Sequence, residues 1–152
     1  MSPLGHLGLG VLAGRWRGYD RRGRLHCLIG AFLPDLVDKP LGALGLVPSF
    51  HTVGHSLLLA GVAALVVAGT GRGEALLVGW VSHLAGDLPL AVPTYLDHYV
   101  WPVAAPPAPP PEPPGSYVAG YVTGPAFAAE LLVAGAALAW VLAARRSAGR
   151  GS

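Results

Sequence analysis

The sequence contains few charged residues for its length. Asp, Glu, Lys and Arg make up 12% of the 152 residues, against roughly 25% in ordinary soluble domains. Hydrophobic residues make up 53%, and the mean hydropathy is +0.53. This composition disfavours the alternative of a soluble all-helical domain with an apolar core, and it predicts an integral membrane protein.

Cysteine, lysine and nucleotide-binding motifs are also scarce or absent. The single cysteine, Cys27, excludes an internal disulfide, and Lys39 is the only lysine. Because no Gly-rich phosphate loop and no basic aromatic surface occurs, nothing predicts nucleotide or nucleic-acid binding. Ser56 and Ser82 each adjoin a histidine, but neither lies in a nucleophile-elbow sequence. The sequence predicts no oligomeric state.

Five apolar segments predict the helices. The predicted fold is an all-α, polytopic membrane bundle of about five helices, forming one domain over residues 1–152. A spanning helix needs roughly 20 apolar residues, and only the third and fifth segments reach that length. The others are then short or partial spans, which occur where they are buried in protein or line a wet cavity. The segments cover about residues 3–15, 25–36, 50–70, 74–88 and 124–145.

A proline-rich connector separates the last two segments. Eight of the 13 residues in 102–114 are proline, so residues 102–116 are predicted to form an extended polyproline-II connector. Residues 124–145 are predicted to be a C-terminal transmembrane helix with Pro125 at its first position. The part before this connector and helix, residues 1–103, is the predicted core.

All nine arginines fall at one end of the bundle if the helices alternate in direction. They lie in the loop after the first segment, in the loop between the third and fourth, and after the fifth. The positive-inside rule makes this end cytoplasmic. The prediction is therefore a protein of the cytoplasmic membrane with a cytoplasmic C-terminus, and Lys39 falls at the opposite end.

Residues of the metal-ligand type occur in three pairs within this apolar sequence, each with one-turn helical spacing. Residues three or four apart share one helix face, so each pair can direct two ligand atoms at one point. Carboxylates and imidazoles bind zinc and related divalent metals. His6 and all three pairs fall at the end away from the arginines, which predicts one shared extracytoplasmic site. The pairs are Asp35 and Asp38, His51 and His55, and His83 and Asp87.

Not all seven residues are equivalent. Asp35 is favoured as a ligand over Asp38, which is alternatively solvated or ion-paired in the neighbourhood of Lys39. His51 is either a ligand or a group that supports one, and His6 is alternatively an interfacial residue. The predicted ligands are His6, Asp35, His51, His55, His83 and Asp87.

Three further residues are candidates for catalytic or proton-transfer roles: Asp38, Glu130 and His98. Glu130 is the only charge in residues 125–144, and an intramembrane ionisable residue is a functional hypothesis by default. It either completes the metal shell or is a protonated carboxyl bonded to a neighbouring helix. His98 lies in a loop on the extracytoplasmic side. His26, at the cytoplasmic end, is not predicted to be a ligand.

Four short motifs, in this order, resemble the YdjM-like family of membrane-bound, metal-dependent hydrolases. The resemblance covers roughly residues 1–103. The second Asp comes one residue later than in the family, Gly54 replaces a threonine, and His51 lies near the place of an arginine. The motifs are Gly5-His6, Leu33-Pro34-Asp35 with Asp38, Gly54-His55-Ser56-Leu57, and Val81-Ser82-His83 with Asp87, followed by Trp101-Pro102.

This family is similar to zinc-dependent phospholipase C and the P1-type nucleases. The resemblance therefore implies a related all-helical core that holds one to three Zn²⁺ or other divalent ions, with a metal-activated water that cleaves a phosphoester. A site at leaflet depth predicts an amphiphilic, lipid-type substrate and the bilayer as partner. The alternatives are a metal transporter or channel, and a non-catalytic scaffold with a structural metal.

Overall fold

The described part of the chain is entirely helical. The computed structural model describes residues 2–91, 96–104 and 122–149, and these ranges contain six helices and no strand. The predicted all-α class is confirmed. The helices are α1 (Pro3–Trp16), α2 (Arg21–Ala43), α3 (Leu57–Thr70), α4 (Glu74–Ala91), α5 (Leu96–Tyr99) and α7 (Pro125–Gly149).

Capping side chains set where two of the helices begin. The Asp20 carboxylate accepts a hydrogen bond from the backbone N–H of Gly23 at 2.7 Å, at the start of α2. The Ser56 hydroxyl accepts one from the N–H of Leu59 at 3.3 Å, at the start of α3. Each bond satisfies a donor that the first helical turn cannot satisfy internally, so each helix starts where the sequence supplies a capping oxygen.

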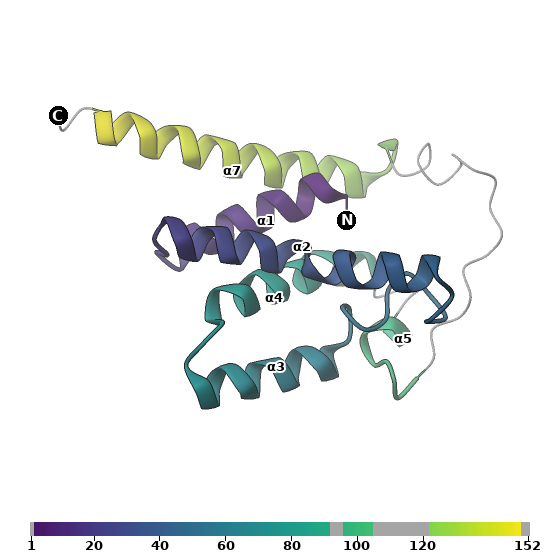
Figure 1. Ribbon diagram of the computed structural model, residues 1–152. Coiled ribbons are helices and arrows are strands. Elements are labelled where there is room, and N and C mark those ends of the chain that lie inside the picture. Colours follow the sequence, from purple (N-terminus) through teal and green to yellow (C-terminus); the bar gives the residue numbers. More distant parts are fainter. Residues whose placement is uncertain (1, 92–95, 105–121, 150–152) are drawn as a thin grey trace.

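Helices α1, α2 and α4 pack against one another and form the centre of the bundle (Figure 1). Helix α7 lies along α1, and α3 contacts α4 on the opposite side of the bundle. The start of α1 is joined to α7, because the backbone N–H of Ser2 donates to the Glu130 carboxylate at 2.7 Å and the Ser2 hydroxyl bonds its other oxygen. The first turn of α1 is thereby held in place.

Two glycines allow α2 and α4 to approach closely. A Cβ atom at Gly30 would lie 2.0 Å from the carbonyl oxygen of Leu76, and one at Gly79 would lie 1.9 Å from the carbonyl oxygen of Cys27. Only glycine fits such contacts, which are typical of tightly packed membrane helices. The approach brings His83, one turn after Gly79, against α2.

The predicted end of α2 is wrong. The prediction ends this helix near Pro34, but it continues to Ala43 through both Pro34 and Pro40. Pro34 lacks the N–H that would bond the carbonyl of Gly30. The helix nevertheless continues because α1 and α4 pack along it.

The predicted helix over residues 50–70 is also shorter than expected. Residues 44–56, here called the 44–56 loop, form turns and bends, and α3 begins after Ser56. The Trp80 indole N–H donates to the carbonyl of Gly54 at 2.6 Å, and a Cβ at Gly54 would lie 2.5 Å from the Cα of Pro34. These tertiary contacts hold the loop on α2 and α4, and they override the helical preference of the apolar pattern.

One helix in the described part of the chain is long and apolar enough to cross a membrane. It contains an 18-residue window, Phe127–Ala144 in α7, with a mean hydropathy of 2.0. Helix α3 is apolar but has only 14 residues, so the third segment does not reach the predicted spanning length. The polytopic arrangement stays a prediction. Most of the predicted proline-rich connector, namely residues 105–116 of 102–116, lies outside the described residues.

Candidate metal centre

The six predicted metal ligands are brought together by α1, α2, α4 and the 44–56 loop. Their ligand atoms form two groups, and within each group these atoms lie within 4.8 Å of one another. The first group is His6 of α1 with His83 and Asp87 of α4, and the second is Asp35 of α2 with His51 and His55 of the loop.

The protein fixes one ring nitrogen of His55 and one of His83. Nδ1 of His83 donates to the backbone carbonyl of Ala31, and Nδ1 of His55 donates to the carboxylate of Asp38, both at 2.7 Å. When each ring is neutral it carries one N–H, and these bonds then place that N–H at Nδ1 and leave each Nε2 as an acceptor. The two Nε2 atoms face each other at 3.0 Å. Two lone pairs at this distance repel unless a proton or a cation lies between them.

Asp87 completes a triangle with these two nitrogens. Its Oδ2 atom lies 3.4 Å from Nε2 of His83 and 3.5 Å from Nε2 of His55. In a tetrahedral site with ligands at about 2.0–2.1 Å from zinc, neighbouring donor atoms are about 3.3 Å apart. The three donor atoms therefore have the spacing of one face of such a site.

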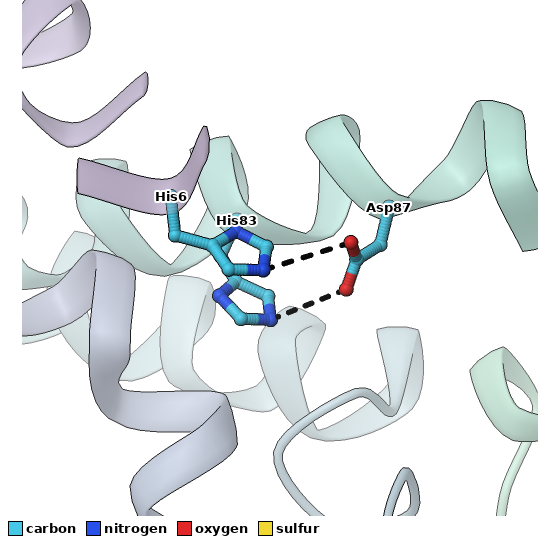
Figure 2. A group of neighbouring side chains, drawn as sticks. All are labelled: His6, His83 and Asp87. Atoms are coloured by element: carbon cyan, nitrogen blue, oxygen red, sulfur yellow. Dashed lines mark ion pairs between the residues drawn. The ribbon is translucent and has the colours of Figure 1, made fainter. Parts of the chain in front are cut away.

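His6 extends the site beyond Asp87. Figure 2 shows the rings of His6 and His83 stacked, each directing a nitrogen at a different oxygen of Asp87. The ring centroids are 3.6 Å apart, and Nε2 of His6 lies 3.6 Å from Oδ1 of Asp87. Because the two oxygens of this carboxylate face different histidines, Asp87 can serve more than one ion.

Asp35 and His51 form the second donor group together with His55. The rings of His51 and His55 pack edge to face with centroids 4.5 Å apart, and Lys39 forms an ion pair with Asp35 at 2.9 Å. Burial, with a smaller contribution from His55, lowers the pKa of His51 to about 3, so its ring is neutral at pH 7. The predicted helix face shared by His51 and His55 is wrong, because both residues lie in the 44–56 loop.

Asp38 supports the cluster from behind His55. It is fully buried and accepts hydrogen bonds from the backbone N–H groups of Thr52 at 2.7 Å and Gly54 at 2.8 Å, besides the His55 ring. A carboxylate bonded to the second nitrogen of a ligating histidine fixes the ring and raises its basicity. Asp38 therefore orients His55 and holds the 44–56 loop on α2.

Replacing Asp38 by asparagine is expected to weaken metal binding by about 10- to 100-fold, the usual cost of losing such a supporting carboxylate. Competition against a chromogenic zinc chelator measures this affinity. The matched control is Glu74→Gln, because Glu74 is exposed and paired with Arg17 in a separate part of the structure. Equal zinc affinities for Asp38→Asn and the wild type would contradict the role given to Asp38.

His98 and Glu130 lie outside both donor groups. Nδ1 of His98 donates to the backbone carbonyl of His51 at 2.6 Å, and the two rings lie 5.7 Å apart. Glu130 is buried and its two oxygens bond Ser2, immediately before α1. His98 thus contacts the backbone of the 44–56 loop, whereas Glu130 anchors the helix that carries His6.

The serines next to His55 and His83 act as structural donors. The Ser56 hydroxyl donates to the carbonyl of Trp101 at 2.5 Å, and the Ser82 hydroxyl donates to the carbonyl of Gly79 at 2.7 Å. Both hydroxyls are therefore engaged by the backbone, in keeping with the absence of a nucleophile motif. His26, as predicted, belongs to neither donor group.

The donor set fits a divalent cation. Three carboxylates and four imidazoles gather at the cluster, and within the described residues Lys39 is the only lysine or arginine that forms an ion pair there. Two buried atoms, Nδ1 of His6 and Oγ1 of Thr52, have no hydrogen-bond partner within the described residues, and each such atom costs about 1–3 kcal/mol. Imidazole and carboxylate suit zinc and other divalent first-row metals. The protein therefore contains groups of histidine and aspartate that can hold a metal ion.

Several supporting groups carry no signal in the sequence. The carbonyl of Ala31 and the N–H groups of Thr52 and Gly54 act through the backbone, so their side chains do not reveal them. Only the pairing of Asp38 with His55 has a signal, namely a carboxylate and an imidazole in neighbouring motifs. Its geometry depends on the fold of the 44–56 loop.

Comparisons with known proteins give no relative for this chain. A scan against protein-family models, a search of curated proteins and a search of solved structures each returned no match. The resemblance to the YdjM-like family stays a prediction.

Proposed function

We propose that this protein is a membrane-bound, metal-dependent hydrolase that cleaves a phosphoester. The observation that carries the proposal is the facing pair of Nε2 atoms of His55 and His83, 3.0 Å apart, with the Asp87 carboxylate next to both. Burying two lone pairs that face each other is costly. A bound divalent cation, with Zn²⁺ the favoured ion, removes that cost.

The size of the cluster favours catalysis over a structural role. A structural zinc site is closed by four protein ligands, whereas this cluster offers six donor side chains in two adjoining groups. We therefore propose a centre of one to three ions with a coordination position open to substrate. A divalent ion held there would lower the pKa of a water toward about 7 and offset charge on a phosphoryl oxygen.

Neighbouring residues of the chain hold the proposed ligands in position for this chemistry. Asp38 and the carbonyl of Ala31 hold the rings of His55 and His83 in one orientation, so little reorganisation accompanies binding. His98, next to the 44–56 loop, is the proposed proton-transfer group.

The proposed location is the cytoplasmic membrane. In this proposal the helices form a polytopic bundle with the metal centre toward the extracytoplasmic side and the C-terminus in the cytoplasm. Support comes from the span in α7 and from the exposure of large apolar side chains, such as Leu65 of α3 at 74% and Leu132 of α7 at 76%. Apolar faces of this kind mark membrane or protein contacts, and the arginine distribution gives the orientation.

The proposed substrate is an amphiphilic, lipid-type phosphoester. Leu44, Leu46 and Phe50 are exposed on the same loop that carries His51 and His55. A phosphoester bound at the metal ions would therefore have apolar surface beside it for an aliphatic chain.

Hydrolysis assays on the full-length, zinc-loaded protein in detergent test this proposal. The substrates are bis(p-nitrophenyl) phosphate, a phospholipid and an isoprenoid phosphate. The wild type is expected to release product from at least one of them, and Asp87→Asn to lower the rate at least about 100-fold, equivalent to about 2.7 kcal/mol in the barrier. Glu74→Gln, at an exposed ion pair outside the cluster, is expected to retain the wild-type rate.

A fully metal-loaded protein that hydrolyses none of these substrates would contradict the proposal and favour a scaffold with a structural metal. Zinc uptake into proteoliposomes without hydrolysis would instead favour a transporter.

A further inference from the structure

A second site lies at the end of the bundle that carries the arginines. A pocket of about 750 Å³ opens there between α1, α2 and α7. Four arginines line it together with apolar side chains that include Leu28 of α2 and Val141 of α7. The arginines are Arg15, Arg21, Arg22 and Arg24.

The positive charge in this pocket is only partly offset by the protein. Within the described residues none of the four arginines forms an ion pair, in contrast to the neighbouring Arg17, which pairs with Glu74. Asp20 also lines the pocket and caps α2 by accepting from the backbone N–H of Gly23 at 2.7 Å, so one carboxylate faces four arginines. Arg24 donates to the backbone carbonyl of Tyr19 at 3.0 Å, so its charge is retained. The pocket therefore has a strong surplus of positive charge.

The pocket is separate from the metal centre. Arg15 lies nine residues after His6 on α1, which corresponds to about 13 Å of helical rise. On α2 the arginines lie in the first turn, whereas Asp35 and Asp38 lie in the second half. In the topology proposed above, this end of the bundle is at the cytoplasmic leaflet, where anionic lipids concentrate.

We propose that this pocket binds an anionic phospholipid. Guanidinium groups bind phosphate oxygens through paired hydrogen bonds, and the apolar wall formed by Leu28 and Val141 would contact the acyl chain. Basic pockets between membrane helices bind lipid headgroups in this way. Inorganic phosphate would offer the arginines the same phosphoryl group as the lipid headgroup. It has no acyl chain to contact the apolar wall, so the wall favours the lipid. This inference rests on the proposed membrane location and is independent of the metal.

Lipid binding to the purified full-length protein in detergent, measured by native mass spectrometry, tests the proposal. The probes are dioctanoyl phosphatidylglycerol, dioctanoyl phosphatidylcholine and inorganic phosphate. We expect at least about tenfold tighter binding of phosphatidylglycerol than of phosphatidylcholine. Each arginine removed in the Arg15→Gln/Arg22→Gln double variant is expected to weaken phosphatidylglycerol binding about fivefold.

Three further variants make the result specific. Arg72→Gln, at an arginine outside the pocket, is expected to bind phosphatidylglycerol as the wild type does, whereas Val141→Trp is expected to block the apolar part and weaken binding. His83→Ala should leave lipid binding unchanged, so failure of the metal centre and failure of this site are distinguishable. Equal binding of the two lipids, unchanged binding by the double variant, or competition by inorganic phosphate at equal concentration would overturn the proposal.

Discussion

Replacing His83 by alanine is expected to lower metal affinity by more than about 100-fold, a larger loss than a supporting residue such as Asp38 gives. His83 supplies one of the two facing Nε2 atoms, and its stacking partner His6 depends on the same ring. Asp87→Asn is expected to have a similar effect, because Asp87 contacts three of the histidines. Zinc titration of the metal-free proteins measures the affinities.

Thermal unfolding provides an independent readout of the same prediction. A ligand that binds only the folded state at 100 times its Kd stabilises that state by about 2.7 kcal/mol. Zinc should therefore raise the unfolding temperature of the wild type and of His26→Gln, which changes a histidine outside the donor groups. A zinc-induced shift of the same size in His83→Ala would show that the metal binds elsewhere.

Gly79→Ala is expected to destabilise the fold by about 3 kcal/mol, at the upper end of the range for overpacking. The new Cβ would lie 1.9 Å from the carbonyl oxygen of Cys27, which belongs to the backbone of α2 and cannot move aside as a side chain can. Separating α4 from α2 would also displace His83 from Ala31, so zinc affinity should fall together with stability.

The matched control is Gly61→Ala. Gly61 lies inside α3, where nothing lies within 4 Å of the position of a new Cβ. Alanine there is expected to stabilise the helix by about 0.5–1 kcal/mol. Thermal unfolding in a single detergent compares both variants with the wild type. If Gly79→Ala is as stable as the wild type, the close contact between α2 and α4 is wrong.

For one of the two ligand pairs that lie on a single helix, the sequence pattern predicted the geometry. His83 and Asp87 share one face of α4, and their ligand atoms lie 3.4 Å apart. This pair lies within an uninterrupted apolar segment, so its spacing alone determines the arrangement. Asp35 and Asp38 also lie on one helix, but Asp35 joins the donors while Asp38 lies behind His55.

The pair in the 44–56 loop could not be predicted in the same way. Spacing placed His51 and His55 on a helix, but the loop is held in turns by Asp38, by the Trp80 indole and by the close contact of Gly54 with Pro34. Each of these contacts joins residues distant in the sequence. The residue types of the site were therefore predictable, whereas the fold of the loop that delivers two of them depends on tertiary packing.

The helix boundaries, too, were predictable where local sequence sets them and were not predictable where tertiary packing sets them. The prediction for the first helix, residues 3–15, agrees closely with α1, because Arg15 and Arg17 mark the change from apolar to charged sequence. The prediction that the second helix ends near Pro34 was wrong. A proline lowers helix stability locally, but packing against α1 and α4 on either side compensates for the lost hydrogen bond.

The central claim is that His55, His83 and Asp87 hold a divalent metal ion. X-ray absorption spectroscopy of the purified protein, loaded with one equivalent of zinc, tests it most directly. The predicted result is a shell of nitrogen and oxygen ligands at about 2.0–2.1 Å, with multiple scattering from at least two imidazoles that decreases in His83→Ala. A spectrum without imidazole scattering, or one that is the same in the wild type and His83→Ala, would contradict the claim.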